Sequence, residues 1–194
     1  MNHPVRLLTI GHSTLPADAF ANMLMAHRVQ LLADVRRYPA SRRHPQFNRE
    51  ALAEMLARHG IAYLHFPGLG GRRKAQPDSL NTAWREAGFR GYADYMATAE
   101  FNQGIVRLLE AAYAGPTAIM CAEKSWRSCH RGLIADHLKA SGIEVIHILN
   151  SAATEPHPWT AAARLIDGRL SYAAGRIDQQ QLLFGENNDR NDAL

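Results

Sequence analysis

The sequence has no apolar run that approaches the roughly 20 residues of a membrane-spanning helix, and it contains only two cysteines, Cys121 and Cys129. The first absence argues against an integral membrane protein. The opening residues 1–6 continue into a strand-like pattern and do not resemble a signal peptide. Two cysteines are too few for a disulfide framework. We therefore expect a cytoplasmic protein with free thiols and no membrane partner.

Positive charge is concentrated in short stretches. The formal net charge is only +4, but ten of the 22 Lys and Arg residues fall in three segments. The segments contain Arg36, Arg37, Arg42 and Arg43; Arg72, Arg73 and Lys74; and Lys124, Arg127 and Arg131. Clusters of this kind indicate an anionic partner, whereas the small net charge by itself does not.

Five apolar runs without clean alternation predict parallel strands that are covered on both faces. The predicted strands are Leu7–Ile10, Leu31–Val35, Ala62–Phe66, Thr117–Cys121 and Val145–Leu149. Amphipathic stretches lie between them, so strand and helix alternate as in crossover connections. The predicted fold is a single α/β domain with a mainly parallel five-stranded sheet and helices on both faces, a Rossmann-like three-layer arrangement.

The helix limits follow from capping residues and turn signals. We expect Thr14 to cap the first helix and Asn48 to cap the second, which Gly60 ends. Two further helices are predicted at 91–98 and 101–114, and a last one from Cys129 to Gly142.

One domain is predicted to span residues 1–184. Its core covers 5–150, and the extension 151–184, which prolines and glycine interrupt, is expected to pack on that core. The polar residues 185–194 are expected to be disordered.

Ligands of open parallel sheets bind beyond the carboxyl ends of the strands. Four predicted strand ends carry polar groups, and we expect them to converge on one crevice. These groups are His12 and Ser13 after the first strand, Asp34 and Arg36 at the second, His65 followed by Gly70, Gly71 and Arg72 at the third, and Cys121 and Glu123 at the fourth.

Several of these groups also have a structural interpretation. His12 and His65 adjoin turns, where a hydrogen-bonded structural histidine is the alternative to a catalytic one. Asp34 lies in an apolar strand and needs a partner, for which Arg36 is the nearest candidate. The glycines and basic residues of segment 68–74 could wrap a phosphate or form a solvated turn.

The stretch from Cys121 to Arg131 gives the strongest functional signal. Cys129 and His130 precede a predicted helix, and a thiolate is stabilised at a helix start beside His and Arg. Alternatively, Cys121 is a small buried hydrophobe and Arg131 pairs with Glu123. A zinc site made of Cys121, Glu123, Cys129 and His130 is a further alternative, although a separation of seven residues between the cysteines is unusual for structural zinc.

The chain resembles the bacterial and archaeal domain of unknown function 488 family over residues 7–149. The matching motifs are Thr9–Thr14, Asp34–Arg36 with Pro39–Ser41, Phe47–Asn48, Tyr63–His65, Leu69–Arg72, Gly88–Ala93, and Met120–Glu123 through Cys129–Arg131. The resemblance implies that these positions, including Ser41 and Tyr92, are shared features of the site. It identifies neither an activity nor a cofactor, so the cofactor is unknown.

We expect a pocket for a phosphate-bearing ligand such as a nucleotide or a nucleic acid. In this hypothesis, Cys129, His130, Cys121 and Asp34 are the catalytic candidates. The ligand-binding candidates are His12, Ser13, Arg36, Ser41, His65, Gly70, Gly71, Arg72, Tyr92, Glu123 and Arg131. The alternatives are a nucleic-acid-binding module without chemistry, in which Tyr38, Phe89 and Trp126 stack bases, and a zinc or thiol-redox sensor.

Overall fold

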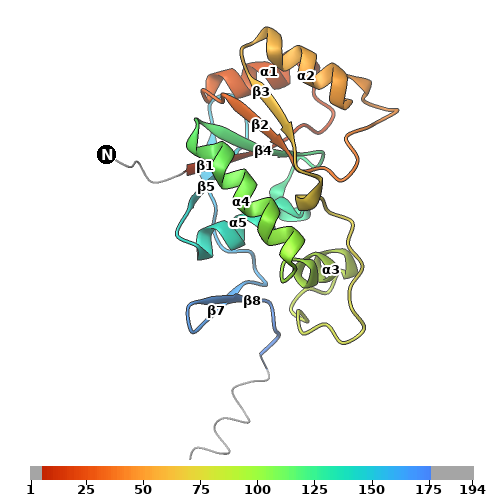
Figure 1. Cartoon of the computed structure of the whole chain (residues 1–194), viewed down its shortest axis with the longest axis vertical. Helices are drawn as coiled ribbons and strands as arrows, with labels where there is room; N and C mark the ends of the chain where they lie inside the picture. The colour runs from red at the N-terminus through yellow and green to blue at the C-terminus, as the bar shows by residue number, and fades with distance from the viewer. Residues whose placement is uncertain (1–5, 176–194) are drawn as a thin grey trace, which may run out of the picture.

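A computed structural model describes residues 6–175. Within this range, a six-stranded sheet has the order β3-β2-β4-β1-β5-β6 (Figure 1). The strands are β1 (Arg6–Gly11), β2 (Leu31–Asp34), β3 (Ala62–His65), β4 (Thr117–Cys121), β5 (Glu144–Ile148) and β6 (Thr154–Pro156). Strands β1 to β5 are parallel, and β6 runs antiparallel to β5.

Helices cover both faces of the sheet, as Figure 1 shows. Helices α1 (Ala17–Ala26) and α2 (Arg49–Arg58) lie on one face, and α3 (Ala87–Tyr95), α4 (Ala99–Tyr113) and α5 (Arg131–Ala140) on the other. Successive strand residues alternate between the two cores: Leu7 belongs to the core under α4 and α5, whereas Leu8 belongs to the core under α1 and α2. The protein is therefore a three-layer α/β domain.

All five predicted strands are present, within one residue at each end. The sequence analysis did not predict the short antiparallel strand β6, nor the separate hairpin of β7 (Arg164–Ile166) and β8 (Arg169–Ser171). The hairpin turns at Asp167 and Gly168, which both have positive φ, the conformation that two-residue hairpin loops require. Strand β3 forms the sheet edge and exposes one face. The expectation that all five strands are covered on both faces is therefore wrong for β3.

The predicted helix starts need correction. Helix α1 begins at Ala17 after Pro16, so Thr14 does not cap it. Asn48 does occupy the N-cap position of α2, but its side-chain oxygen accepts a hydrogen bond from the backbone N–H of Ser41 at 2.6 Å. Helix α3 begins four residues before the predicted Gly91, and α5 begins at Arg131, two residues after Cys129.

No helix within residues 6–175 has the length and apolar character needed to cross a membrane. The prediction for the tail 185–194, and that for the last part of the 151–184 extension, fall outside the described residues.

Candidate functional site

A cavity of about 740 Å³ opens where β1, β2 and β4 end. The parallel register brings these ends together, since Gly11 lies opposite Cys121 and Asp34 opposite Met120. The cavity is lined by His12, Ser13, Thr14, Arg36, Arg37, Tyr38, Ala40, Ser41, His44, Gly71, Arg72, Glu86, Gly88, Phe89, Tyr92, Cys121, Ala122, Glu123, Lys124, Ser128, Cys129 and His130.

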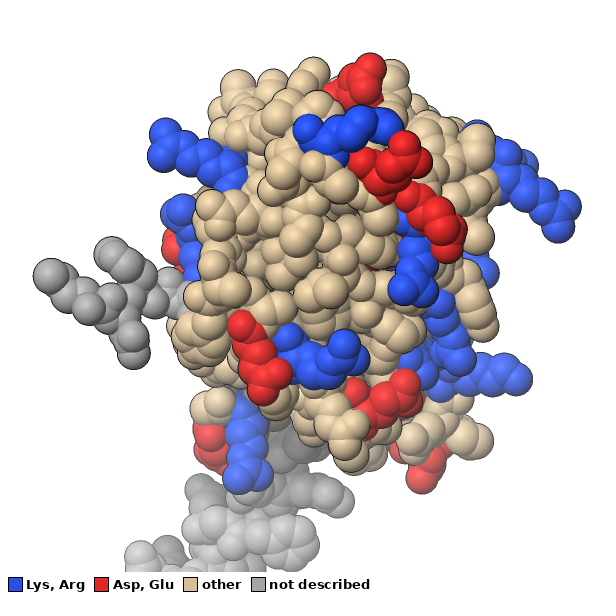
Figure 2. Space-filling view, turned by 45° about the horizontal axis from the view of Figure 1, so that its top comes forward, with Lys and Arg blue, Asp and Glu red and all other residues tan. Residues whose placement is uncertain are grey.

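The cavity wall carries more basic than acidic side chains. Arg36, Arg37, Arg72 and Lys124 line it, against Glu86 and Glu123. On the face shown in Figure 2, basic and acidic side chains are interspersed around a mostly uncharged centre. That face therefore has no continuous basic surface of the kind that tracks a nucleic-acid backbone.

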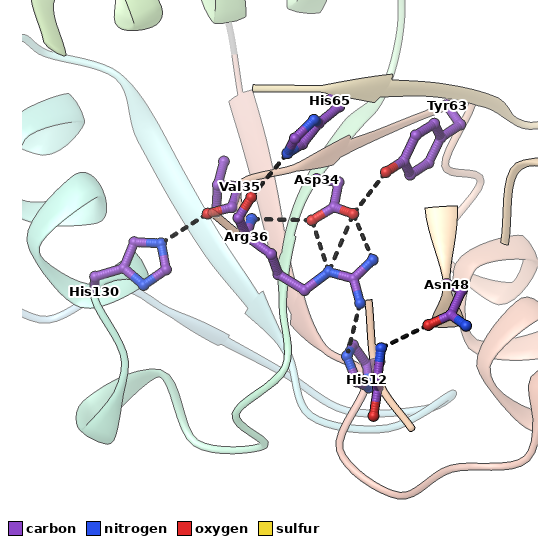
Figure 3. Close-up of polar contacts among 9 residues, drawn as sticks. His12, Asp34, Val35, Arg36, Asn48, Tyr63, His65 and His130 are labelled. Carbon is purple, nitrogen blue, oxygen red and sulfur yellow. Dashed lines mark hydrogen bonds and ion pairs between the residues drawn. The ribbon is translucent and has the colours of Figure 1, made fainter. Parts of the chain in front are cut away.

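Asp34 and Arg36 form a buried ion pair next to the cavity (Figure 3). The Asp34 carboxylate accepts hydrogen bonds from the Arg36 backbone N–H at 3.0 Å, from Arg36 Nε at 2.9 Å and from Arg36 Nη2 at 2.6 Å. The Tyr63 hydroxyl donates a further bond at 2.7 Å. The Asp34 side chain is fully buried and does not line the cavity, so it acts by orienting Arg36.

His12 is a neutral acceptor for this arginine. Burial lowers the pKa of His12 to about 4. Its Nδ1–H donates to the Ser13 carbonyl oxygen at 2.8 Å, which leaves Nε2 to face Arg36 Nη1 at 3.4 Å. The ring also stacks on Phe47 with centroids 4.0 Å apart. Arg36 is thus fixed between a carboxylate and an imidazole, with its positive charge at the cavity wall.

Three predicted ligand-binding residues, His65, Gly70 and Arg131, lie outside the cavity lining. The Nε2 of His65 bonds to the Arg36 carbonyl oxygen at 2.8 Å (Figure 3), so this histidine supports the loop that follows β2. Gly70 packs directly against Arg37, and a Cβ atom at position 70 would approach the Arg37 Cα to 2.7 Å. His65 and Gly70 therefore support residues of the cavity wall without lining the cavity themselves.

The two cysteines, Glu123 and His130 converge at the cavity floor. The Cys121 sulfur lies 2.8 Å from Glu123 Oε2 and 3.9 Å from His130 Nδ1. The Cys129 sulfur lies 3.3 Å from the same carboxylate oxygen and 3.7 Å from the same ring nitrogen. Arg131 donates from Nε to the Cys129 sulfur at 3.4 Å.

This arrangement favours a thiolate on Cys129. Burial alone would raise the pKa of the Cys129 thiol, but the Cys121 thiol, His130 and Arg131 outweigh it and hold the pKa well below its ordinary range. The hydrogen bond to Cys129, together with burial, raises the pKa of Cys121 well above the usual thiol range. These directions favour Cys121 as the protonated thiol and Cys129 as the anion of the pair.

The His130 ring is oriented by the backbone of β2. Its Nε2–H donates to the Val35 carbonyl oxygen at 3.0 Å (Figure 3). This bond turns Nδ1 toward both sulfurs. Burial opposes the charged ring, but the neighbouring Cys129 raises the pKa of His130. Gly71 is required beside it, because a Cβ atom at position 71 would lie 2.9 Å from Nδ1.

Arg131 lies behind the cysteine and away from the cavity. Its side chain is buried, and Nη2 donates to the Glu123 carbonyl oxygen at 2.5 Å. The contact with Glu123 is therefore to the backbone and not the carboxylate pair that was considered from the sequence. Arg131 does not line the cavity, so it acts on Cys129 and not on a ligand there.

A metal ion is the other group that this cluster could hold. One donor atom each from Cys121, Cys129 and His130 lie within 4.8 Å of one another. These are soft ligands of the type that zinc takes, and a ring N–H bonded to a backbone carbonyl is typical of metal-binding histidines.

The structure brings eleven of the fifteen predicted site residues to one cavity. Asp34, His65, Gly70 and Arg131 lie behind its wall. Among the lining residues, Arg37, His44, Lys124 and Glu86 were not predicted to belong to the site, whereas Tyr38 and Phe89 were considered only as rings that stack bases. The first three are close in sequence to predicted site residues, which is the signal that could have found them. Glu86 is the N-cap residue of α3, a helix that no strand pattern linked to the sheet edge.

Trp126 is not free to stack bases. Its side chain is 4% exposed, and its ring stacks on His147 with centroids 4.4 Å apart. Tyr38 and Phe89 do line the cavity.

The fold and the site define a three-layer α/β protein with a basic cavity above a cysteine–histidine cluster. The chain belongs to the family described as Domain of unknown function DUF488, whose family model matches residues 16–138. No curated protein and no solved structure matches the chain.

Proposed function

We propose that the cavity binds a phosphate-bearing ligand of the nucleotide type and that Cys129 is the nucleophile that attacks it. The observation that carries the proposal is the position of the Cys129 sulfur. Cys129 lines a basic cavity, and its sulfur is in contact with His130 and Arg131. A thiolate that is held in this way is a strong nucleophile at neutral pH.

The cavity wall supplies the recognition. Arg37, Arg72 and Lys124 offer charge-assisted hydrogen bonds to phosphate oxygens, and the fixed guanidinium of Arg36 also lines the cavity. Tyr38 and Phe89 line the same cavity and offer ring faces for a base. This combination of cations and rings favours a nucleotide over inorganic phosphate alone.

The proposed reaction is hydrolysis of a phosphate ester in two steps. The Cys129 sulfur attacks phosphorus and forms an S–P bond while the P–O bond to the leaving group breaks, and the leaving oxygen takes the proton from His130 Nδ1. Water then attacks phosphorus, the S–P bond breaks, and the thiolate is restored. The proton that water loses returns to His130.

Binding can be measured by isothermal titration calorimetry with inorganic pyrophosphate and with AMP as probes. Arg72→Ala removes an exposed cation of the cavity wall, and we expect it to weaken binding about tenfold, as the loss of one charge-assisted hydrogen bond does. The matched control is Arg58→Ala, which removes an exposed arginine on α2 that is paired with Glu54. The proposal is contradicted if the wild-type protein binds neither probe, or if the two variants bind with equal affinities.

Zinc binding is the second candidate, because three donor atoms of soft ligands converge at the cavity floor. Elemental analysis of the purified protein separates the two functions. One zinc per chain would assign Cys129 to the metal and overturn its role as nucleophile, whereas a substoichiometric content supports that role.

A further inference from the structure

A continuous chain of buried hydrogen bonds runs from Arg131 to Asp136 through residues outside the cavity. Arg131 Nη1 lies 3.4 Å from Thr9 Oγ1, which lies 2.6 Å from His147 Nδ1. His147 Nε2 lies 2.8 Å from His157 Nδ1, and His157 Nε2 lies 3.0 Å from Asp136 Oδ1. All five residues are buried.

Every hydrogen bond of this chain is donated in the same direction, from Arg131 toward Asp136. Besides His157, Asp136 accepts hydrogen bonds from the backbone N–H and hydroxyl of Thr160 and from the Tyr172 hydroxyl, so it acts throughout as an acceptor. His157 therefore donates from Nε2, which leaves Nδ1 to face His147 as an acceptor. Burial lowers the pKa of His147 to about 2, so this ring is neutral. It donates from Nε2 and accepts from Thr9 at Nδ1.

The other end of the chain fixes the Arg131 guanidinium. Because the Thr9 hydroxyl donates to His147, its oxygen is free to accept from Arg131 Nη1. Nη2 is held by the carbonyl oxygens of Glu123 and Lys124. With both terminal nitrogens held, the plane of the guanidinium is set, and Nε points at the Cys129 sulfur.

We propose that Thr9, His147 and His157 are positioning residues that hold Arg131 in hydrogen-bond contact with the reactive sulfur of Cys129. The inference rests on the proposed role of Cys129 as nucleophile. It gives the segment 154–172 a function in the site, because His157, Thr160 and Tyr172 belong to it. Thr9 and His147 also lie outside the residues that the family model matches.

The test is the rate at which iodoacetamide alkylates Cys129 as a function of pH, followed by peptide mass spectrometry. Thr9→Val keeps the shape of the side chain and removes the hydroxyl, and Thr9→Ser keeps the hydroxyl. We expect Thr9→Val to slow alkylation at pH 6 about five- to tenfold and to move the midpoint of the profile upward. Thr9→Ser should react like the wild type.

The groups that face the Cys129 sulfur are not substituted in these variants, and of them only Arg131 is expected to lose its position. They are Cys121, Glu123, His130, Arg131 and Tyr92. Thermal unfolding of each variant separates positioning from packing, since a merely structural role lowers the melting temperature without moving the pH profile. His147→Phe, which keeps a ring beside Trp126, should reproduce the shift.

An unchanged profile in Thr9→Val, or an equal shift in Thr9→Ser, overturns the inference. Titration of the same proteins with pyrophosphate and with AMP keeps the two proposals distinguishable. If the wild type binds neither probe, the proposed function fails, but the alkylation profiles still decide whether Thr9 acts on Cys129.

Discussion

Removal of the Asp34 carboxylate should destabilise the fold far more than removal of an exposed carboxylate. The side chains of Asp34 and Arg36 are 0% and 6% exposed, and Asp34 accepts bonds from the arginine and from Tyr63. Asp34→Ala leaves a buried guanidinium without its counter-charge and the tyrosine hydroxyl without its acceptor. Loss of one partner of a buried pair costs about 3–5 kcal/mol, so we expect a decrease of that size in the free energy of unfolding.

Urea unfolding at pH 7, followed by circular dichroism, measures this decrease. The matched control is Glu54→Ala, whose partner Arg58 is 64% exposed, and an exposed pair of this kind contributes about 0–1 kcal/mol. The double variant Asp34→Leu with Arg36→Met removes both charges and should regain most of the lost stability. A decrease below about 1 kcal/mol for Asp34→Ala, or a double variant less stable than the single one, would refute the reasoning.

Two further predictions concern the histidines of the site. The pKa of His12 falls from 6.5 to about 4 on folding, so the unfolded chain binds more protons between these values and stability decreases as the pH drops through that range. His12→Gln should reduce the slope of the unfolding free energy against pH by the equivalent of about one bound proton, as measured by urea unfolding between pH 4 and 7. An unchanged slope would contradict this prediction. Gly71→Ala places a Cβ atom 2.9 Å from His130 Nδ1 and should slow Cys129 alkylation at pH 6 about fivefold, because the ring loses its position beside the sulfur. Gly68→Ala, whose added Cβ atom would lie 3.7 Å from the Glu100 carbonyl oxygen and outside the cavity lining, is its control and should leave the rate unchanged; equal rates in the two variants would show that the contact between Gly71 and His130 is unimportant.

The sheet could be predicted because each parallel strand is a short apolar run between turn signals. Strand β6 could not, since it has only three residues, ends in Pro156 and is specified by pairing with β5 and not by its own composition. Helix α1 started later than expected because Pro16, and not Thr14, precedes its first turn.

The strand-end rule placed His12, Arg36 and Cys129 at one cavity because parallel strands deliver their carboxyl ends to the same edge. The hydrogen-bonded residues buried behind that cavity could not be predicted in this way. His147 lies inside an apolar strand, and His157 lies between two prolines in an irregular segment. Their contact depends on the antiparallel return of β6 along β5, which only the tertiary structure determines.

The central claim is that a reactive Cys129 thiolate lies in a positively charged cavity. It is tested most directly by the ratio of alkylation rates of Cys129 with iodoacetate and with iodoacetamide, two reagents that differ in charge. The neutral thiol 2-mercaptoethanol gives the reference ratio. We predict that the rate with iodoacetate relative to that with iodoacetamide is higher at Cys129 than in the reference. This ratio at Cys129 should decrease in Arg72→Ala and at high salt. A ratio equal to or below the reference, unaffected by salt, would contradict the account.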